Sequence, residues 1–468
     1  MLIGEHWVDK KEKIEVRNPY NNDIVDTVPK GTKEDIKKAI GCAVIGFKIS
    51  KNMPVHERIN ILMKAAEIIV DNHEEFTITI CSEGSKTIRE ARKEVNRAIN
   101  TISISAEEAR RIIGETLPFD SVPGSENRVG YYYRFPIGVI GAITPFNDPL
   151  NLVAHKLGPA IAAGNAVVLK PATVTPLSAL KLGEAFLKAG LPKNILNIIT
   201  GYGDEVGDAL VSDNRVRMIS FTGGVDAGLK VLKNAGLKKI GLELGSSSPC
   251  IVMDDANIDK AVKLCFSGSF CAAGQNCIGV QRIFIHINVY NEFVKKFVNL
   301  TKKLKVGQQT DEQTDMGPMI TEKEAIRVET WVDEAVEKGA KILTGGKRFG
   351  TIYYPTLLEN IPKNVKVDCE EIFGPVVCLY KIRNLDDAIK KANDVKYGLH
   401  AGIFTKSIEN AFKAVKELDV GGIMVNDSSD YRIDLMPFGG VKYSGLGREG
   451  IKHALLEMTE PKVVCFNL

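Results

Sequence analysis

The sequence lacks both a long apolar run and a block of charge of one sign. Its apolar stretches are interrupted by Arg134, by glycine or by proline, whereas a helix that crosses a membrane needs about 20 predominantly apolar residues in a row. The opening residues, MLIGEHWVDKKEK, show no basic segment followed by an apolar one, so we expect no export signal. A net charge of +3 over 468 residues offers little attraction to nucleic acid. We therefore expect neither a membrane nor a nucleic-acid partner.

The sequence also lacks a cysteine pattern typical of disulfides or metal sites. The nine cysteines are an odd number and contain no CxxC pair, and no histidine lies near them at the spacing of a zinc site. This pattern predicts no disulfide framework and no metal site, and it favours the cytoplasm. Two of the cysteines stand out in FCAAGQNCIG, residues 270–279, where Cys271 falls on an apparent helical run and Cys277 at a junction before a strand. By themselves, both could equally be buried, inert thiols.

The chain alternates between strand-like and helical segments, which predicts an α/β fold of two domains. Short β-branched runs begin after Pro136 with GVIGAI, NAVVLK, NILNIITG and RVRMISFTGG, and SALKLGEAFLKAG has helical spacing. A second series begins near Pro249 with PCIVM, IDKAVKLCFSGSF and QRIFIHI. A helical region from about Lys33 to Ile113 precedes both series, and RVGYYYRFP and EPKVVCFNL read as strands outside either core.

Several short motifs occur in a fixed order along the chain. They are TPFND with Asn147, NAVVLKPA with Lys170, FTGG, LELGSSSP with Glu243, GQNC with Cys277, EEIFGPV, and PFGGVKYSGLGREG. Each motif is weak alone, but together and in register they leave little room for coincidence. Over essentially its whole length the chain resembles the NAD(P)-dependent aldehyde dehydrogenase superfamily, and in particular its lactaldehyde dehydrogenase-like branch.

The resemblance implies a fold and a set of domain boundaries. Residues 1–117 and 137–245 are expected to form a Rossmann-type cofactor domain to which residues 444–455 return. Residues 246–443 are expected to form an α/β catalytic domain. The segments 118–136 and 456–468 are expected to be strands of a small oligomerisation element, so that the protein assembles as a homodimer or homotetramer.

The resemblance also assigns three catalytic roles. Cys277 would add to the aldehyde as a thiolate, because the carbonyl carbon must become tetrahedral before it can release a hydride. Asn147 and the backbone N–H of Cys277 would stabilise the resulting oxyanion. Glu243 would be the base that activates water against the thioester. From the residues alone, Asn147 could be a turn residue before Pro149, and Glu243 could lie on a solvated strand face.

Cofactor contacts are implied at eleven positions. These are Lys170, Thr173, Thr144, Pro145, Phe146, Thr222, Gly223, Gly224, Leu244, Glu371 and Phe373. The chain departs from the family at Gly224, where relatives commonly carry serine, and at Ser246 and Ser247, where most carry glycine and lysine. Thr173 stands where NAD-preferring relatives often have a glutamate that would repel a 2'-phosphate. We therefore expect NADP to be favoured, with NAD also accepted.

The substrate contacts implied by the family lie in a helix around residues 103–114, beside Asn147 and Cys277, and in the loop before PFGG. In this chain, the residues at these positions are Arg432, Arg111, Asp148, Asn276 and Ile278. This polar lining favours a short hydroxylated aldehyde of the lactaldehyde or glyceraldehyde type. Arg432 and Arg111 could instead bind an anionic semialdehyde or a phospho- or phosphono-aldehyde, or Arg432 could merely pair with Asp430 or Asp434.

Three other functions fit the same residues less well. Enzymes that pass the acyl group to coenzyme A characteristically lack the hydrolytic glutamate, and Glu243 is present. A non-catalytic binding protein on this scaffold would be expected to lose the cysteine, the base or the amide. A cysteine hydrolase needs a histidine partner, and the sequence suggests only His400, which as a lone residue is more often structural.

Overall fold

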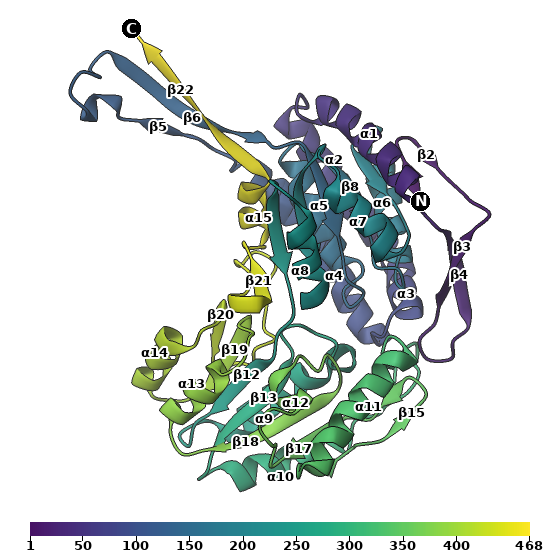
Figure 1. Ribbon diagram of the computed structural model, residues 1–468, viewed down its shortest axis with the longest axis vertical. Coiled ribbons are helices and arrows are strands. Elements are labelled where there is room, and N and C mark those ends of the chain that lie inside the picture. The colour runs from purple at the N-terminus through teal and green to yellow at the C-terminus, as the bar shows by residue number, and fades with distance from the viewer.

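Two separate sheets organise the chain, as the two series of β-branched runs predict. The structure, a computed structural model, describes residues 1–468, and Figure 1 shows the two lobes one above the other. The sheet of the first lobe has the strand order β2-β1-β9-β8-β7-β10-β11-β21, and its central pairs are parallel. Its strands are β1 (Leu2–Ile3), β2 (His6–Trp7), β7 (Val139–Ile143), β8 (Ala166–Lys170), β9 (Leu196–Ile198), β10 (Val216–Thr222), β11 (Lys239–Glu243) and β21 (Gly445–Leu446).

Helices pack on this sheet through apolar stripes, which is why the region after Lys33 reads as amphipathic. Thr32 and Asp35 form a capping box that starts α1, and Gly190 takes a positive φ of 94° just after α6 ends. The helices are α1 (Lys33–Ser50), α2 (Val55–Asp71), α3 (His73–Glu83), α4 (Ile88–Ala109), α5 (Asn151–Ala162), α6 (Leu177–Lys188), α7 (Asp208–Ser212), α8 (Val225–Asn234) and α15 (Ile451–Glu457). A hairpin of β3 (Lys13–Arg17) and β4 (Ile24–Pro29) lies beside them.

The second lobe has its own sheet, in the order β14-β17-β18-β13-β12-β19-β20. Its strands are β12 (Ser248–Val252), β13 (Val280–His286), β14 (Lys341–Thr344), β17 (Thr356–Glu359), β18 (Val376–Ile382), β19 (His400–Phe404) and β20 (Gly422–Val425), with a small hairpin of β15 (Arg348–Phe349) and β16 (Ile352–Tyr353). Its helices are α9 (Ile258–Phe270), α10 (Tyr290–Thr301), α11 (Glu322–Glu337), α12 (Lys366–Cys369), α13 (Leu385–Asn393) and α14 (Ile408–Glu417). Separate apolar cores fill the two lobes, which confirms the predicted α/β class.

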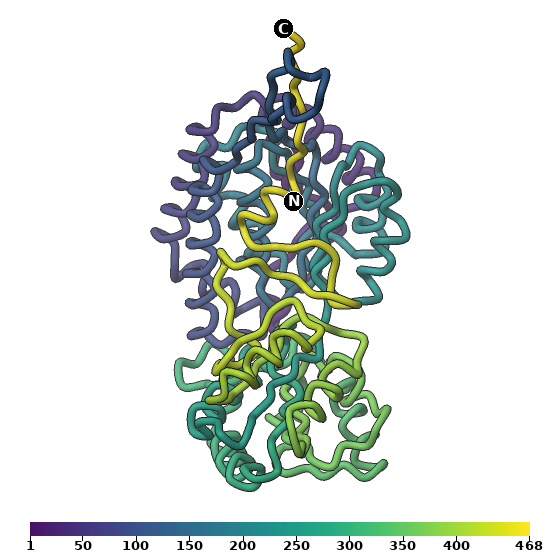
Figure 2. Tube along the Cα trace, turned by 90° about the vertical axis from the view of Figure 1, so that its left-hand side faces the viewer, coloured from purple at the N-terminus to yellow at the C-terminus, as the bar shows by residue number.

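A narrow arm extends from the first lobe in both views (Figures 1 and 2). It is a three-stranded sheet in which β22 (Thr459–Asn467) and β5 (Glu115–Leu117) flank β6 (Arg128–Pro136). The predicted boundary at residue 118 therefore cuts β5 from the sheet it belongs to. Residues 444–455 do return to the first lobe, since β21 pairs with β11 and Ile451 is buried in that core. The division into functional domains itself stays a prediction.

No helix combines the length and the apolar composition that a bilayer crossing requires.

Candidate active site

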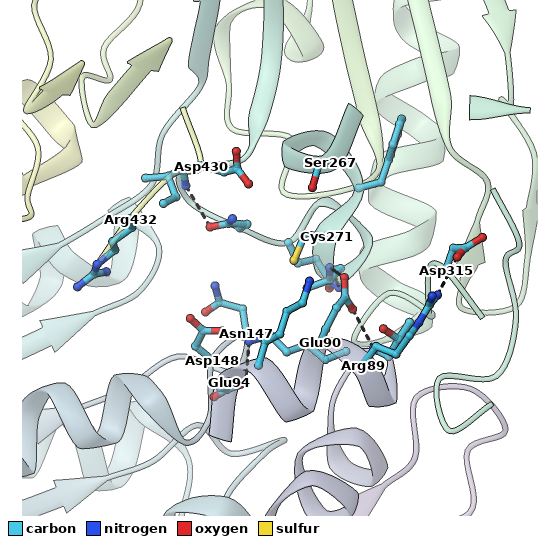
Figure 3. Close-up of a pocket in the computed structure, with 18 of the residues that line it drawn as sticks. Arg89, Glu90, Glu94, Asn147, Asp148, Ser267, Cys271, Asp315, Asp430 and Arg432 are labelled. Atoms are coloured by element: carbon cyan, nitrogen blue, oxygen red, sulfur yellow. Dashed lines mark hydrogen bonds and ion pairs between the residues drawn. The ribbon is translucent and has the colours of Figure 1, made fainter. Parts of the chain in front are cut away.

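Two cavities meet between the lobes. One, of about 910 Å³, is lined by a charged face of α4 and by residues 270–278, and we call it the α4 cavity. The other, of about 940 Å³, lies at the carboxyl ends of β7, β10 and β11, where an open parallel sheet places its ligands, and we call it the sheet cavity. Figure 3 shows side chains converging on the α4 cavity from α4 and from the loops of the second lobe. Five residues line both cavities: Asn147, Leu152, Gln275, Cys277 and Arg432.

Cys277 lies on a short loop between α9 and β13. Helix α9 ends at Phe270, so Cys271 lies just beyond the helix and not on it as its sequence suggested. Between the two cysteines the backbone forms a left-handed turn, with φ of 50° at Ala272, 55° at Ala273 and 71° at Gly274. A left-handed conformation costs a residue other than glycine roughly 1–2 kcal/mol. The packing around the turn must supply that energy.

The thiol of Cys277 is half-buried and opens onto both cavities. Burial raises its pKa to about 12, Glu371 and Glu243 act in the same direction, and Arg432 opposes them. The group is therefore a protonated thiol at neutral pH. It needs a base before it can act as a nucleophile.

Glu243 ends β11 and lies on the wall of the sheet cavity together with Cys277. Its side chain is buried, so the alternative of a solvated strand face is wrong. Burial, followed by the nearby Glu449, raises its pKa well above the usual value, and Oε2 has no hydrogen-bond partner. A buried carboxylate with an unpaired oxygen is suited to accept a proton.

Asn147 follows β7 in the loop that leads to α5, and it lines both cavities. The structure therefore brings Asn147, Glu243 and Cys277 to the walls of one space, the sheet cavity.

The predicted cofactor residues line the sheet cavity with one exception. Those on its wall are Thr144, Pro145, Phe146, Thr173, Thr222, Gly223, Gly224, Leu244, Glu371 and Phe373. Lys170 is buried behind the wall, where Nζ donates to the carbonyl of Pro171 at 2.9 Å and to Thr173 Oγ1 at 3.3 Å. Burial lowers the pKa of Lys170 to about 8.

The wall of the sheet cavity fits a nicotinamide dinucleotide. Thr144 and Thr222 each carry a buried hydroxyl with no partner in the protein. Helix α8 begins directly after Gly224, so its first N–H groups are available to an anion, and a side chain at Gly224 would enter open space. The Glu371 carboxylate accepts a hydrogen bond from the Ser246 N–H at 2.8 Å, and burial raises its pKa to about 7. The Ser246 hydroxyl bonds Ser248 at 3.0 Å and is satisfied inside the protein.

The α4 cavity receives the predicted substrate residues Arg432, Asp148, Asn276 and Ile278, but not Arg111. The side chain of Arg111 is 62% exposed and pairs with Glu108. No residue of 103–114 lines this cavity; Lys86, just before α4, and the face of α4 from Arg89 to Arg97 do so instead. Because a helix rises 1.5 Å per residue, the end of α4 at Ala109 lies roughly 18 Å along the axis from Arg97, and Arg111 follows beyond that end. The predicted segment 103–114 therefore does not reach the α4 cavity.

Two cations of this wall, Lys86 just before α4 and Arg97 on it, were not predicted from the sequence. Lys86 binds both Asp148 and Glu94, the latter at 2.7 Å. Arg97 donates to Asp148 Oδ2 at 3.3 Å and to Asp434 Oδ1 at 2.9 Å. Their only local signal is a stripe of charged residues spaced three and four apart, which predicts a solvated helix face as readily as a cavity wall.

Arg432 pairs with neither of the acids proposed to brace it. Asp430 accepts a hydrogen bond from Ser428, and Asp434 Oδ1 lies 2.9 Å from His155 Nε2. Because that carboxylate oxygen can only accept, Nε2 carries the proton and cannot also accept one from Arg432 at 3.5 Å. The nearest carboxylate to Arg432 is Glu449, at 3.9 Å.

The guanidinium of Arg432 is therefore short of hydrogen-bond acceptors, and it is also buried. Its side chain is only 7% exposed, its Nε has no partner, and it lies 3.6 Å from the centre of the Phe438 ring. A buried cation of this kind is available to a ligand in either cavity.

Comparisons with known proteins agree with this geometry. Residues 7–464 match the aldehyde dehydrogenase family. The chain is 50% identical over its whole length to 3-sulfolactaldehyde dehydrogenase of Priestia megaterium, covering 98% of that protein. It is 42% identical to lactaldehyde dehydrogenase of Methanococcus aeolicus, with both chains fully covered. The crystal structure of glyceraldehyde-3-phosphate dehydrogenase GapN from Methanocaldococcus jannaschii, complexed with NADP, superposes with a TM-score of 0.95 at 40% identity, over 98% of this chain and 100% of that one. The chain therefore belongs to the aldehyde dehydrogenase family and is an NAD(P)-dependent aldehyde dehydrogenase.

Proposed function

We propose that the protein oxidises a small hydroxylated aldehyde, of the lactaldehyde or glyceraldehyde type, to its carboxylate through a covalent adduct on Cys277. The observation that carries this proposal is the meeting of the two cavities at Cys277, because a substrate and a dinucleotide can reach one sulfur from opposite sides. Two of the relatives act, by name, on lactaldehyde or its 3-sulfo derivative, and both compounds are 2-hydroxyaldehydes. The polar lining of the α4 cavity suits the hydroxyl group.

The first chemical step uses three residues. Cys277 loses its proton to Glu243, directly or through water, and the thiolate adds to the carbonyl carbon to form a thiohemiacetal. The carbonyl oxygen becomes negative and accepts hydrogen bonds from the Asn147 carboxamide and from the N–H of Cys277. The low-dielectric surroundings that raise the pKa of the thiol also strengthen these hydrogen bonds.

NAD(P), which the wall of the sheet cavity would hold, would accept the hydride that the adduct loses, and this would leave a thioester on Cys277. After the proton that Glu243 took from Cys277 has passed to solvent, the carboxylate takes a proton from a water molecule, whose oxygen attacks the thioester carbon. The carbon–sulfur bond breaks, the carboxylate product leaves, and the sulfur is free for the next cycle. The raised pKa of Glu243 makes its carboxylate a stronger base than one in water.

NADP is the favoured cofactor in this proposal. Thr173 lines the sheet cavity and adds no negative charge there, and its hydroxyl lies 3.3 Å from the Lys170 ammonium. A 2'-phosphate is attracted by that ammonium and meets no acid at this position.

An anionic aldehyde is a second candidate, and Arg432 favours it. Its guanidinium lies on the wall of the α4 cavity with an unpaired Nε, and Arg97 lines the same cavity. The two like charges oppose each other, which contributes to the lowered pKa of Arg432 after the effect of burial. A carboxylate, sulfonate or phosphate at the far end of the substrate would relieve that repulsion.

Two sets of assays test these assignments. Cys277→Ser should abolish oxidation. Glu243→Gln should release one equivalent of reduced cofactor, more slowly than the unaltered protein, and then stall, because water can take the thiol proton in place of Glu243 but the thioester is not hydrolysed without the base. A steady rate in the Glu243 variant, with no burst, contradicts the role given to that residue. For the substrate, Arg432→Gln should lower kcat/KM for 3-sulfolactaldehyde at least tenfold and for lactaldehyde less than threefold. Equal losses for the two compounds would rule out the anionic candidate.

Assembly and location complete the proposal. The arm exposes Val129, Tyr133, Phe135, Val463 and Phe466, an apolar surface of the kind that protein interfaces cover. All nine cysteines are free, which suits the reducing cytoplasm. We therefore expect a cytoplasmic homo-oligomer, and light scattering after size exclusion should report a mass of two or four chains. A monomer at micromolar concentration would contradict the proposed assembly.

A further inference from the structure

The left-handed turn before Cys277 is bonded to the opposite lobe by one side chain. Glu90 lies in the first turn of α4, and Figure 3 shows it facing the segment that carries Cys271. Its Oε1 accepts a hydrogen bond from the backbone N–H of Ala272 at 3.0 Å. This bond joins the first lobe to the loop of the proposed nucleophile.

The remaining contacts of the turn come from its own lobe. The Gln275 carboxamide donates to the carbonyl of Ala272 at 2.9 Å and accepts from the N–H of Ile320 at 2.9 Å. A side chain at Gly274 would lie 2.2 Å from the carbonyl oxygen of Gly374, so that part of the turn has no space to move. Ala272 and Ala273 are both buried, and both hold the left-handed conformation that alanine avoids.

We propose that Glu90 is a positioning residue for Cys277, because its carboxylate holds Ala272 and Ala273 in the left-handed turn that sets the place of the thiol. The inference rests on the proposed role of Cys277. Strained backbone persists only where its surroundings impose it, and it gathers at functional sites. Here the packing of the buried turn and the hydrogen bond from the other lobe act together, and a shift of the thiol by about 1 Å is enough to slow a reaction by about a hundredfold.

A helix cap is the plain alternative role. Glu90 Oε2 accepts from the N–H of Thr87 at 2.9 Å, so the residue also caps α4. Aspartate does the same at the third position of α1, where Asp35 accepts from the N–H of Thr32 at 2.8 Å. The variant Glu90→Asp therefore keeps the cap and the charge, but it is too short to reach Ala272. The variant Glu90→Gln keeps one oxygen that can accept from Ala272, but its NH2 group cannot accept from Thr87, so it loses the charge and the cap bond.

These two variants separate the roles. We expect Glu90→Asp to fold normally and to lower kcat at least tenfold with KM changed less than threefold, and Glu90→Gln to retain kcat within about threefold. Once the turn relaxes, Cys277 becomes more exposed, so in Glu90→Asp its alkylation by iodoacetamide should rise at lower pH than in the unaltered protein. Mass spectrometry of the Cys277 peptide measures that profile without any turnover.

A rescue experiment tests the strain directly. Glycine adopts the left-handed conformation without penalty, so Ala273→Gly should restore kcat at least threefold in the Glu90→Asp background. A role confined to the helix cap predicts unaltered kcat and alkylation in Glu90→Asp, and either result overturns the proposal, as does a Glu90→Gln variant as slow as Glu90→Asp. If Cys277→Ser still oxidises aldehydes, the proposed function fails, while the alkylation profiles still decide whether Glu90 sets the position of this thiol.

Discussion

His155 Nε2 lies 2.9 Å from Asp434 Oδ1, and both side chains are buried. The contact joins α5 to the loop before PFGG, and Arg97 of α4 reaches the same carboxylate oxygen at 2.9 Å. One acid thus ties two helices to the loop that carries Arg432. Neither His155 nor Arg97 was expected at the site, because each lies in a helix that reads as ordinary packing.

Replacing this acid should cost stability in a pH-dependent way. Burial by itself would raise the pKa of Asp434, but the hydrogen bond from His155 and the charge of Arg97 lower it well below its usual range. The stabilisation is therefore present above the unfolded pKa of about 4 and declines as the pH falls below it. Asp434→Asn should lower the free energy of unfolding at pH 7 by about 3 kcal/mol, the lower end for a broken buried pair. Urea titrations at pH 7 and pH 3.5 should show a smaller loss at the lower pH, and an equal loss would contradict this.

Removal of the proposed oxyanion donor should act on turnover. Asn147→Ala should lower kcat by about 100- to 1000-fold, as the loss of one such donor does elsewhere. Its melting temperature should stay within a few degrees, because Asn147 is half-buried on a cavity wall. Steady-state kinetics beside a thermal melt check both values, and a change confined to KM would argue against the role.

Cofactor choice should respond to the charge at residue 173. Thr173→Glu places a carboxylate on the sheet cavity wall beside Lys170, where it repels a 2'-phosphate. The ratio of kcat/KM for NADP to that for NAD should fall at least tenfold. Thr173→Gln, which adds similar bulk without charge, is the control and should move the ratio less. An unchanged ratio in Thr173→Glu removes the basis for NADP preference.

Replacement of Arg111 should leave the activity on both aldehydes nearly unchanged. Its side chain is mostly exposed and pairs with Glu108, away from the α4 cavity. Arg111→Ala should leave kcat/KM for lactaldehyde and for 3-sulfolactaldehyde within about twofold, since exposed ion pairs contribute little. A selective loss with the anionic aldehyde would return Arg111 to the substrate site.

Glu371 should make the protein less stable as the pH rises. Burial raises its pKa from 4.5 to about 7 in the folded chain, so the folded state binds more protons than the unfolded state between these values. The free energy of unfolding therefore falls as the pH rises through that window and is constant above it. Glu371→Gln removes the effect, and because the carboxylate is only half-buried we expect a gain over the unaltered protein of roughly 2 kcal/mol between pH 4.5 and pH 8. Denaturant titrations across this range give the difference, and parallel curves would contradict it.

The sequence predicted the position of those motifs that directly follow a strand. The residues after β7, β10 and β11 reach one cavity because the carboxyl ends of parallel strands share one edge of a sheet. Strand and helix periods predicted those strands, so the walls around Thr144, Thr222 and Leu244 follow from short-range pattern. Lys170 shows the limit of such reasoning, since it ends its strand as expected but turns behind the cavity wall onto Pro171 and Thr173.

The sequence by itself determined the family, the α/β class and the residues proposed for catalysis, because motifs, strand alternation and helix caps are written in neighbouring positions. Only the tertiary structure decided which part of α4 faces the substrate cavity, what Arg432 leaves unpaired, and which side chain holds the turn before Cys277. The physical reason is distance along the chain. Arg97 and Asp434 are 337 positions apart, and Glu90 and Ala272 are 182 apart. Such pairs exist only when the two lobes pack together, and no local pattern encodes the geometry of that packing.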